Sequence, residues 1–262
     1  MRILITGAGR AIGRATATCL AEAGHEVVAT ARDVHLLDDL DVAAKLSLDV
    51  TSASSIEACL AAAGDLDAMV NNAALSGKAP LEQIPLDHLR AMFETNTFGP
   101  LALIQAVLPA WRTRGSGVIV NVSSIQGRVA TPLEGAYAAT KFALEAFTES
   151  LHYEVGHFGI RLVLIEPGFT APGMKASPDF PVNPAYAGLV EQWDGVDDVV
   201  AGPGGRPSPD GVARAILAAL EDSATPLRVP VGDDAAMILP LRAQLDDATF
   251  EATMRATLGL TW

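Results

Sequence analysis

The sequence predicts an α/β protein built on a doubly wound parallel β-sheet. Short apolar runs alternate with longer helical patterns along the chain, without internal repeats. The run 117–122 is nearly all apolar, which is typical of a strand buried on both faces of a parallel sheet. The run 3–5 leads directly into a glycine-rich turn and an alanine-rich helical stretch. These features favour parallel strands joined by right-handed helical crossovers.

The same patterns place the elements in order. Seven strands are expected, at 3–5, 25–30, 44–48, 67–70, 117–122, 160–165 and 227–231. Helices are expected from the glycine turn to about 23, after 51 to about 63, at 86–114 with a kink or restart at Pro100, around 137–141 to about 157, at 210–221 and at 235–258. The last of these is expected to pack on the domain or to make a subunit contact.

Composition bounds the class of protein. A chain of 262 residues, 50% hydrophobic and 19% charged, is long enough to form one domain over 1–262 with a full core. The net charge of −13 repels nucleic-acid phosphates and anionic lipid, so neither is expected as a partner. Cys19 and Cys59 lie in helical patterns, so we expect buried free thiols and no metal site.

Targeting signals are missing from the sequence pattern. No apolar run approaches the ~18 residues that span a membrane, so membrane insertion is not expected. The first residues enter the glycine turn at once, which leaves no room for a signal peptide. A cytoplasmic protein is therefore expected.

Residues 6–13 (Thr-Gly-Ala-Gly-Arg-Ala-Ile-Gly) follow the first expected strand and precede the first helix. Gly7, Gly9 and Gly13 allow the backbone to approach a ligand closely. Free N–H groups and the dipole at the start of the helix favour an anion. The sequence indicates a phosphate-binding turn, with a purely structural tight turn as the alternative.

The second strand ends at Ala31-Arg32-Asp33, and Ala31 stands 18 residues after the last glycine of the turn (31 − 13). In dinucleotide-binding folds an acidic residue about 20 positions after the turn holds the ribose 2′-hydroxyl, whereas an arginine accommodates a 2′-phosphate. Arg32 therefore favours NADP(H) over NAD(H), with Arg10 as a second contact and Arg14 as a weaker third. Asp33 is expected to point to the other face of the strand end. A solvated turn is the alternative.

Tyr137 and Lys141 stand four residues apart, on one face of a helix. An ammonium ~4 Å from a phenol supplies roughly 4 kcal/mol at a dielectric of ~20, enough to move the pKa of a tyrosine from ~10 to about 7. Lys141 is therefore expected to make Tyr137 an acid or base at neutral pH. Ser124 precedes Tyr137 by 13 residues (137 − 124). The alternative, a chance pair, has to be decided by other residues.

Other polar residues stand where ligands bind in open parallel sheets. The segment 71–74 (Asn-Asn-Ala-Ala) follows the fourth strand, and Asp49-Val50 follows the third. The asparagines would alternatively form an Asx turn. Asn96 lies in the middle of a predicted helix, where asparagine is mildly unfavourable and needs a reason.

The segment 170–209 breaks the alternation, with roughly 40 residues rich in proline and glycine. Met174, Phe180, Tyr186 and Trp193 are scattered through it. Apolar residues within a long connection favour a functional lid over a disordered linker. We expect a lid that is mobile without ligand and closes over a bound substrate.

Taken together, the motifs resemble the short-chain dehydrogenase/reductase family over essentially the whole chain except 170–209. The resemblance implies a Rossmann fold. The family turn, Thr-Gly-x-x-x-Gly-x-Gly, is matched at Thr6, Gly7 and Gly13, whereas Ala11 stands where the family usually has glycine. The position at which the family often has threonine is Pro172 here, and Thr170 is expected to replace it.

The resemblance also implies a catalytic tetrad of Asn96, Ser124, Tyr137 and Lys141. In this scheme Tyr137 protonates the carbonyl oxygen, Ser124 hydrogen-bonds it, and Lys141 holds the ribose and lowers the pKa of Tyr137; Asn96 holds a water that relays protons to Lys141. The expected cofactor-binding residues are Gly7, Gly9, Arg10, Ile12, Gly13, Arg32, Asp49, Val50, Asn72, Ala73, Tyr137, Lys141, Pro167, Gly168 and Thr170. The expected substrate-binding residues are Ser124, Gln126 and Tyr137.

The resemblance implies an NADP(H)-preferring carbonyl reductase or alcohol dehydrogenase, most similar to members acting on bulky apolar ketones and alcohols such as hydroxysteroids and retinol. Two alternatives are a non-catalytic dinucleotide sensor and an epimerase or dehydratase that uses the same Tyr-Lys pair. A homodimer or homotetramer is expected.

Overall fold

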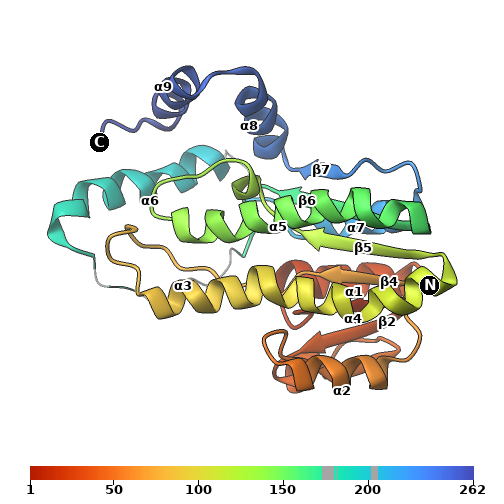
Figure 1. The fold of residues 1–262 in the computed structure, drawn as a ribbon. Helices are drawn as coiled ribbons and strands as arrows, with labels where there is room; N and C mark the ends of the chain where they lie inside the picture. Colours follow the sequence, from red (N-terminus) through yellow and green to blue (C-terminus); the bar gives the residue numbers. More distant parts are fainter. Residues whose placement is uncertain (173–179, 181, 202–205) are drawn as a thin grey trace.

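A computed structural model describes residues 1–172, 180, 182–201 and 206–262, with the backbone alone at 197–201 (Figure 1). Met174, which we predicted to belong to a lid, lies outside these residues. Within them no helix combines the length and the apolar character needed to cross a bilayer.

The sheet has seven parallel strands in the order β3-β2-β1-β4-β5-β6-β7. These are β1 (Arg2–Ile5), β2 (Glu26–Ala31), β3 (Ala44–Ser47), β4 (Ala68–Asn71), β5 (Gly117–Val122), β6 (Ile160–Pro167) and β7 (Arg228–Val231). The doubly wound fold is confirmed, and each strand lies within about two residues of its predicted position. The order reverses between β1 and β4, which is where such sheets open a crevice for ligands.

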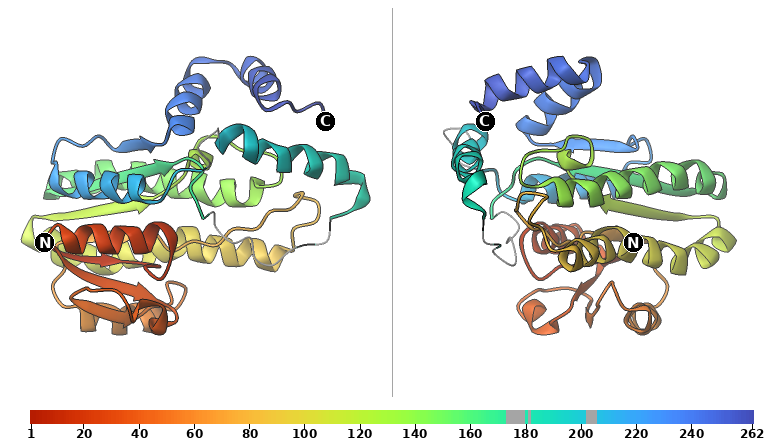
Figure 2. Two further views of the ribbon diagram at one scale, coloured as in Figure 1. Left: turned by 180° about the vertical axis from the view of Figure 1, so that it is seen from behind. Right: turned by 60° about the vertical axis from the view of Figure 1, so that its left-hand side comes forward.

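Helices cover both faces of the sheet, because side chains alternate along each strand. Ile3 and Ile5 of β1 point into a cluster with α1 (Ala11–Glu22) and α7 (Asp210–Glu221), which lie together on the face seen from behind in Figure 2. Leu4 points the opposite way, into a cluster with α2 (Ala53–Ala63), α4 (Gly99–Arg114) and the end of α5 (Gly135–Val155). The core is therefore split by the sheet into two apolar layers.

The predicted helix at 86–114 is interrupted. It consists of α3 (Leu86–Phe93), a π-helical turn (Glu94–Phe98) and α4, which has Pro100 in its first turn. The interruption falls at Asn96 rather than at Pro100. A π-helical turn widens the backbone locally and is frequent at functional sites.

The described part of 170–209 is more regular than its composition suggests. A 3₁₀ turn (Pro184–Tyr186) leads into α6 (Ala187–Ala201), whose Trp193 and Val196 are buried against Leu133. The predicted tail helix is two helices, α8 (Asp233–Gln244) and α9 (Asp247–Leu258). The break occurs because Asp246 caps α9, accepting a hydrogen bond from the N–H of Thr249 at 2.8 Å.

Candidate active site

The predicted glycine turn and the Asn72-Ala73 segment meet at the reversal of strand order. Thr6 Oγ1, at the end of β1, accepts hydrogen bonds from the N–H groups of Asn72 and Ala73, both at 2.9 Å. The Asn72 side-chain amide donates to the carbonyl oxygens of Thr6 at 2.9 Å and Gly7 at 3.2 Å. Asn72 therefore holds the turn in shape, as well as bordering the crevice.

The glycines of the turn are required by close packing. Gly7 has a φ of +69°, and a Cβ on Gly13 would lie 2.3 Å from the carbonyl oxygen of Gly7. A Cβ on Gly9 would lie 3.0 Å from Leu36. Ile12 packs against the core layer under α1.

The start of α1 is built to receive an anion. Arg10 occupies the N-cap without a side-chain capping bond, and the first turn holds no acidic residue. The backbone N–H groups of that turn are thus directed out of the helix end without a capping side chain. This arrangement fits the pyrophosphate of a dinucleotide.

Ala11 adopts a φ of +44°, in the left-handed region that glycine favours. The alanine therefore follows the backbone path of the glycine that the family has at this position. Its methyl group leaves the turn intact, with the strain that a Cβ brings to this conformation.

The end of β2 matches the predicted selectivity site in part. Ala31 is buried and Arg32 is exposed beyond it. The Asp33 side chain caps a short 3₁₀ helix: its Oδ1 accepts a hydrogen bond from the N–H of His35 at 3.1 Å. Arg14 is bound to Asp39 at 2.8 Å. The Arg14 contact with a 2′-phosphate stays a prediction, and it would compete with this ion pair.

Asp49 and Val50 follow β3 on the adenine side of the crevice expected from the resemblance. Asp49 Oδ1 accepts from the N–H and the hydroxyl of Thr51, at 2.9 and 2.7 Å, and these bonds hold the pKa of its carboxyl below the usual value. Val50 is buried against Gly99, where a Cβ would lie 2.9 Å from its side chain. The first residue of α4 therefore has to be small.

Asn96 is fully buried in the π-helical turn, and its side chain connects two other elements. Its Nδ2 donates to the carbonyl oxygen of Leu75 at 2.8 Å and to Thr140 Oγ1 at 3.0 Å. Its Oδ1 accepts from the N–H of Leu75 at 2.7 Å. Both side-chain donors are thus in use, so the side chain serves to join β4's loop to α5. The water relay proposed for Asn96 stays a prediction.

Ser124 and Tyr137 come together as predicted. The Ser124 hydroxyl hydrogen-bonds the phenol and lowers its pKa, and Ser124 Oγ also accepts from the N–H of Gln126 at 3.1 Å. Burial raises the pKa of Tyr137 well above its ordinary value, and the charge of Glu134 raises it further. Lys141 was predicted to lower the pKa of Tyr137. In the structure the pKa is raised instead, because the effect of burial is larger.

The Lys141 ammonium lies over the Tyr137 ring. Its Nζ is 5.6 Å from the centroid of the Tyr137 ring and donates to the carbonyl oxygen of Val122 at 2.7 Å. Burial lowers the pKa of Lys141 to about 8. An ammonium has three donors, so the others are available to a ribose hydroxyl.

Apolar side chains pack around the Tyr137 ring. Gln126 is buried, and its Nε2 bonds the carboxylate of Glu134. The cluster that includes the Tyr137 ring contains Ala79, Ile84, Met92 and Ala136, with Leu75, Leu89 and Phe180 packed against it. The sequence pattern indicated only that some of these belong to a helix, and it did not connect them with Tyr137.

Pro167 is the last residue of β6, and Gly168 after it is fixed by the C-terminal part of the chain. Asp234, in the first turn of α8, accepts from the N–H of Phe169 at 2.7 Å. A Cβ on Gly168 would overlap the Asp234 carboxylate, at 1.9 Å. Thr170 is half-buried just beyond. Sequence reasoning missed Asp234, which lies 65 residues from Phe169.

Comparison with known proteins agrees with this geometry. The family model described as short chain dehydrogenase matches residues 1–179. Human retinol dehydrogenase 8 is 38% identical over 179 residues, covering 63% of this chain and 58% of that protein.

Two crystal structures align with nearly the whole chain. A short-chain dehydrogenase from Streptomyces avermitilis has a TM-score of 0.82 at 38% identity, covering 98% of this chain and 97% of the other. A short chain dehydrogenase from Burkholderia cenocepacia, solved in complex with NADP, has a TM-score of 0.77 at 27% identity and covers 99% and 97%.

The matched family model spans well over half of the chain, and the Streptomyces avermitilis structure aligns with 98% of it at 38% identity. The protein therefore belongs to the short-chain dehydrogenases, a family of oxidoreductases that bind a nicotinamide dinucleotide and act on CH–OH and C=O groups.

Proposed function

We propose that the chain is an NADP(H)-preferring reductase of bulky apolar ketones, or the corresponding alcohol dehydrogenase. The observation that carries the proposal is the contact between the Ser124 and Tyr137 hydroxyl groups, with the Lys141 ammonium 5.6 Å from the centroid of the Tyr137 ring. Two hydroxyl donors that converge on one point stabilise a developing alkoxide.

The residues divide the work as follows. NADP(H), when bound, supplies or accepts the hydride. Tyr137 donates its proton to the carbonyl oxygen as charge develops there, while Ser124 hydrogen-bonds the same oxygen. Lys141 adds a positive charge near the pair and donors for the ribose. The high pKa of the buried phenol keeps Tyr137 protonated at neutral pH, the form required for reduction.

The preference for NADP(H) rests on Arg32 beyond a buried, neutral Ala31. Asp33, the nearest carboxylate in sequence, is committed to its capping bond with His35. Arg10, at the start of α1, is a second candidate contact. The NADP complex of the Burkholderia cenocepacia relative is consistent with this preference.

The substrate class rests on the apolar cluster around Tyr137, in which Met92 is fully buried and Phe180 is partly exposed. We propose that the segment 170–209 forms a lid over this apolar cluster. Two contacts of its described part support this: Trp193 packs on Leu133, and Asp194 forms an ion pair with Lys78. Retinol dehydrogenase 8, similar over 179 residues, is named for an apolar alcohol.

We also propose that copies of the chain associate through α5. Phe142 and Phe147 are exposed on this helix, 44% and 37%, and Phe98 and Phe158 are exposed beyond it. Exposed aromatic residues of this number favour a contact surface.

Two free cysteines, Cys19 and Cys59, suit a reducing compartment such as the cytoplasm.

A panel assay tests the function. The purified protein is given NADPH and a set of ketones of graded size and polarity, and the oxidation of NADPH is followed by its absorbance. We expect net oxidation with large apolar ketones. Cofactor binding without net oxidation on any ketone would favour the sensor or the epimerase alternative.

A further inference from the structure

Behind the catalytic pair, α5 carries a buried carboxylate, that of Glu145. Glu145 stands one turn after Lys141, and both side chains are almost completely buried. Residues four apart lie on the same face of a helix. Tyr137, Lys141 and Glu145 therefore form a row that runs from the site into the protein.

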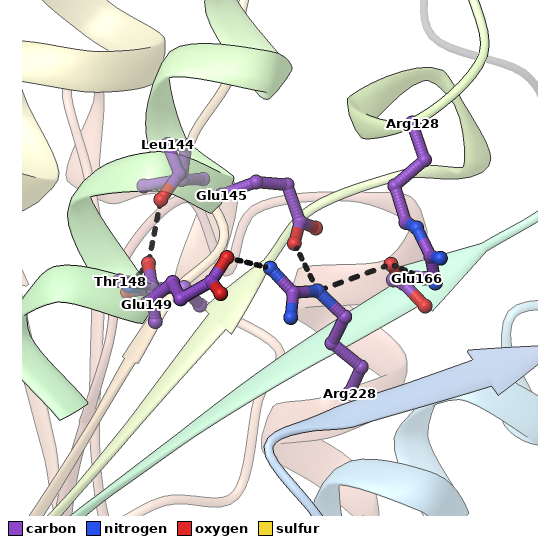
Figure 3. A network of polar contacts seen from close by, with 8 residues as sticks. Arg128, Leu144, Glu145, Thr148, Glu149, Glu166 and Arg228 are labelled. Carbon is purple, nitrogen blue, oxygen red and sulfur yellow. Dashed lines mark hydrogen bonds and ion pairs between the residues drawn. The ribbon is translucent and has the colours of Figure 1, made fainter. Parts of the chain in front are cut away.

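Glu145 is held on one side by an arginine of the neighbouring strand, as Figure 3 shows. Its Oε2 accepts from Arg228 Nε, on β7, at 2.9 Å. Arg228 in turn donates to Glu149, one further turn along α5, at 2.8 Å. The pairing fixes the catalytic helix to the far edge of the sheet.

The other side of Glu145 faces the turn that carries Ser124. A Cβ on Gly127 would lie 2.8 Å from Glu145 Cγ and 2.6 Å from Ser123 Oγ, so the backbone of the turn lies directly against both side chains. Burial raises the pKa of the Glu145 carboxyl, and the Ser123 hydroxyl and the Arg228 guanidinium lower it in part. Glu145 thus contacts the segment that positions the catalytic serine.

The charge of Glu145 also acts on Lys141. Burial lowers the pKa of this lysine, and the Glu145 carboxylate is the group that raises it. A buried ammonium needs such a counter-charge to remain protonated. The two effects oppose each other at a lysine whose pKa is about 8, near physiological pH.

We propose that Glu145 is a positioning residue: its carboxylate keeps Lys141 in the ammonium form and holds the turn that carries Ser124. The proposal rests on the proposed function of the Tyr137 site. Glu145 itself reaches the reaction only through Lys141 and Ser124.

Several charged and titratable groups face Glu145 from the elements around it. They are Lys141 and Glu149 on α5, Arg128 after the 3₁₀ turn Ile125–Gly127, Glu166 on β6 and Arg228 on β7, with the Ser123 hydroxyl at the end of β5. Glu149 is exposed and meets only the outer side of Arg228. Glu149→Gln is therefore a matched control for Glu145→Gln, because each variant removes one carboxylate that is paired with Arg228.

The test measures the affinity for NADPH as a function of pH, by the fluorescence of the reduced nicotinamide. In the unmodified protein we expect affinity to fall as the pH rises through about 8, where Lys141 loses its proton. In Glu145→Gln the midpoint should move about one pH unit lower, the usual effect of losing a nearby opposite charge. Glu149→Gln should keep the original midpoint, and Glu145→Asp, which keeps the charge, should restore it.

An unchanged midpoint in folded Glu145→Gln overturns the proposal. If that variant does not fold, Glu145→Gln/Arg228→Gln removes both members of the pair, and Arg228→Gln alone is its reference. The pH midpoint of NADPH affinity should then be lower in Glu145→Gln/Arg228→Gln than in Arg228→Gln. Equal midpoints in these two variants overturn the proposal. Because binding is measured, absence of turnover on every ketone would count against the proposed function without deciding the role of Glu145.

Discussion

Thr140 Oγ1 accepts a hydrogen bond from Asn96 Nδ2 at 3.0 Å and donates one to the carbonyl oxygen of Tyr137 at 2.7 Å. This threonine therefore joins the π-helical turn to the catalytic helix. Thr148, two turns further along α5, makes the corresponding pair of bonds with Asn121 and the carbonyl oxygen of Leu144, at 2.8 and 2.6 Å, away from the site.

The two threonines allow stability and catalysis to be separated. Thr140→Val and Thr148→Val each leave a buried amide donor unpaired, so each should lower the free energy of unfolding by about 1–3 kcal/mol. Only Thr140→Val should also lower kcat, because Thr140 lies between Tyr137 and Lys141 on α5, whereas Thr148 lies about two turns beyond Lys141. Urea denaturation and steady-state turnover measure the two effects, and equal turnover in both variants would count against a catalytic role for Asn96.

Ala11 gives a prediction about the strained turn. Ala11→Gly relieves the strain of a left-handed alanine, and part of that gain is offset by the greater freedom of glycine in the unfolded chain. We expect the free energy of unfolding to rise by about 0.5–1 kcal/mol. Ala15→Gly, in the regular part of α1, should lower it by about 1 kcal/mol. A destabilised Ala11→Gly would show that the alanine is not strained.

Glu166 gives a prediction about pH. It is fully buried, with neither oxygen hydrogen-bonded within the described residues, and burial raises the pKa of its carboxyl to about 7. A raised native pKa stabilises the fold below the unfolded value of about 4.5, and this contribution is lost as the pH rises through 7. From about pH 5.5 to about pH 8 the loss amounts to about 2 kcal/mol.

Glu166→Gln removes this titration, so the melting temperature should fall less between these two pH values than it does in the unmodified protein, by about 4 °C. Glu149→Gln is the control, because its pKa is lowered by Arg228 and its titration lies at more acidic pH. If both variants keep the pH dependence of the unmodified protein, Glu166 does not titrate near neutrality.

Arg32 gives a prediction about cofactor choice. A guanidinium that meets the 2′-phosphate makes charge-assisted bonds worth about 1.5–3 kcal/mol, or roughly 10- to 150-fold in affinity. We expect at least a roughly tenfold preference for NADPH over NADH in kcat/KM, most of it lost in Arg32→Ala. Arg14→Ala should keep most of the preference, because the ion pair with Asp39 competes with any contact between Arg14 and the 2′-phosphate. Equal efficiency with NADH in the unmodified protein contradicts the assignment.

The sequence predicts the sheet and the meeting of Ser124 with Tyr137 for the same reason. Parallel strands bring their carboxyl ends to one edge, so motifs that follow different strands converge there. Gly7, Asn72, Ser124 and Pro167 all stand at such ends. Alternating apolar runs are enough to predict this arrangement without any knowledge of side-chain packing.

The remaining features depend on distant contacts that a local pattern does not contain. Glu145 and Arg228 are 83 residues apart, and Phe169 and Asp234 are 65 apart. The direction of the Tyr137 pKa was predicted wrongly because the charge of Lys141 was considered without the burial of the phenol. The π-helical turn at Asn96 likewise depends on Leu75 and Thr140, which lie on other elements.

The central claim is that Tyr137 protonates a carbonyl while hydride is transferred from NADPH, and Tyr137→Phe tests it most directly because the ring stays and only the hydroxyl is lost. The measurement pairs NADPH oxidation on the best ketone of the panel with NADPH affinity at the same pH. We expect turnover to fall by roughly 10²–10⁴ with affinity nearly unchanged. Near-normal turnover in Tyr137→Phe would contradict the claim.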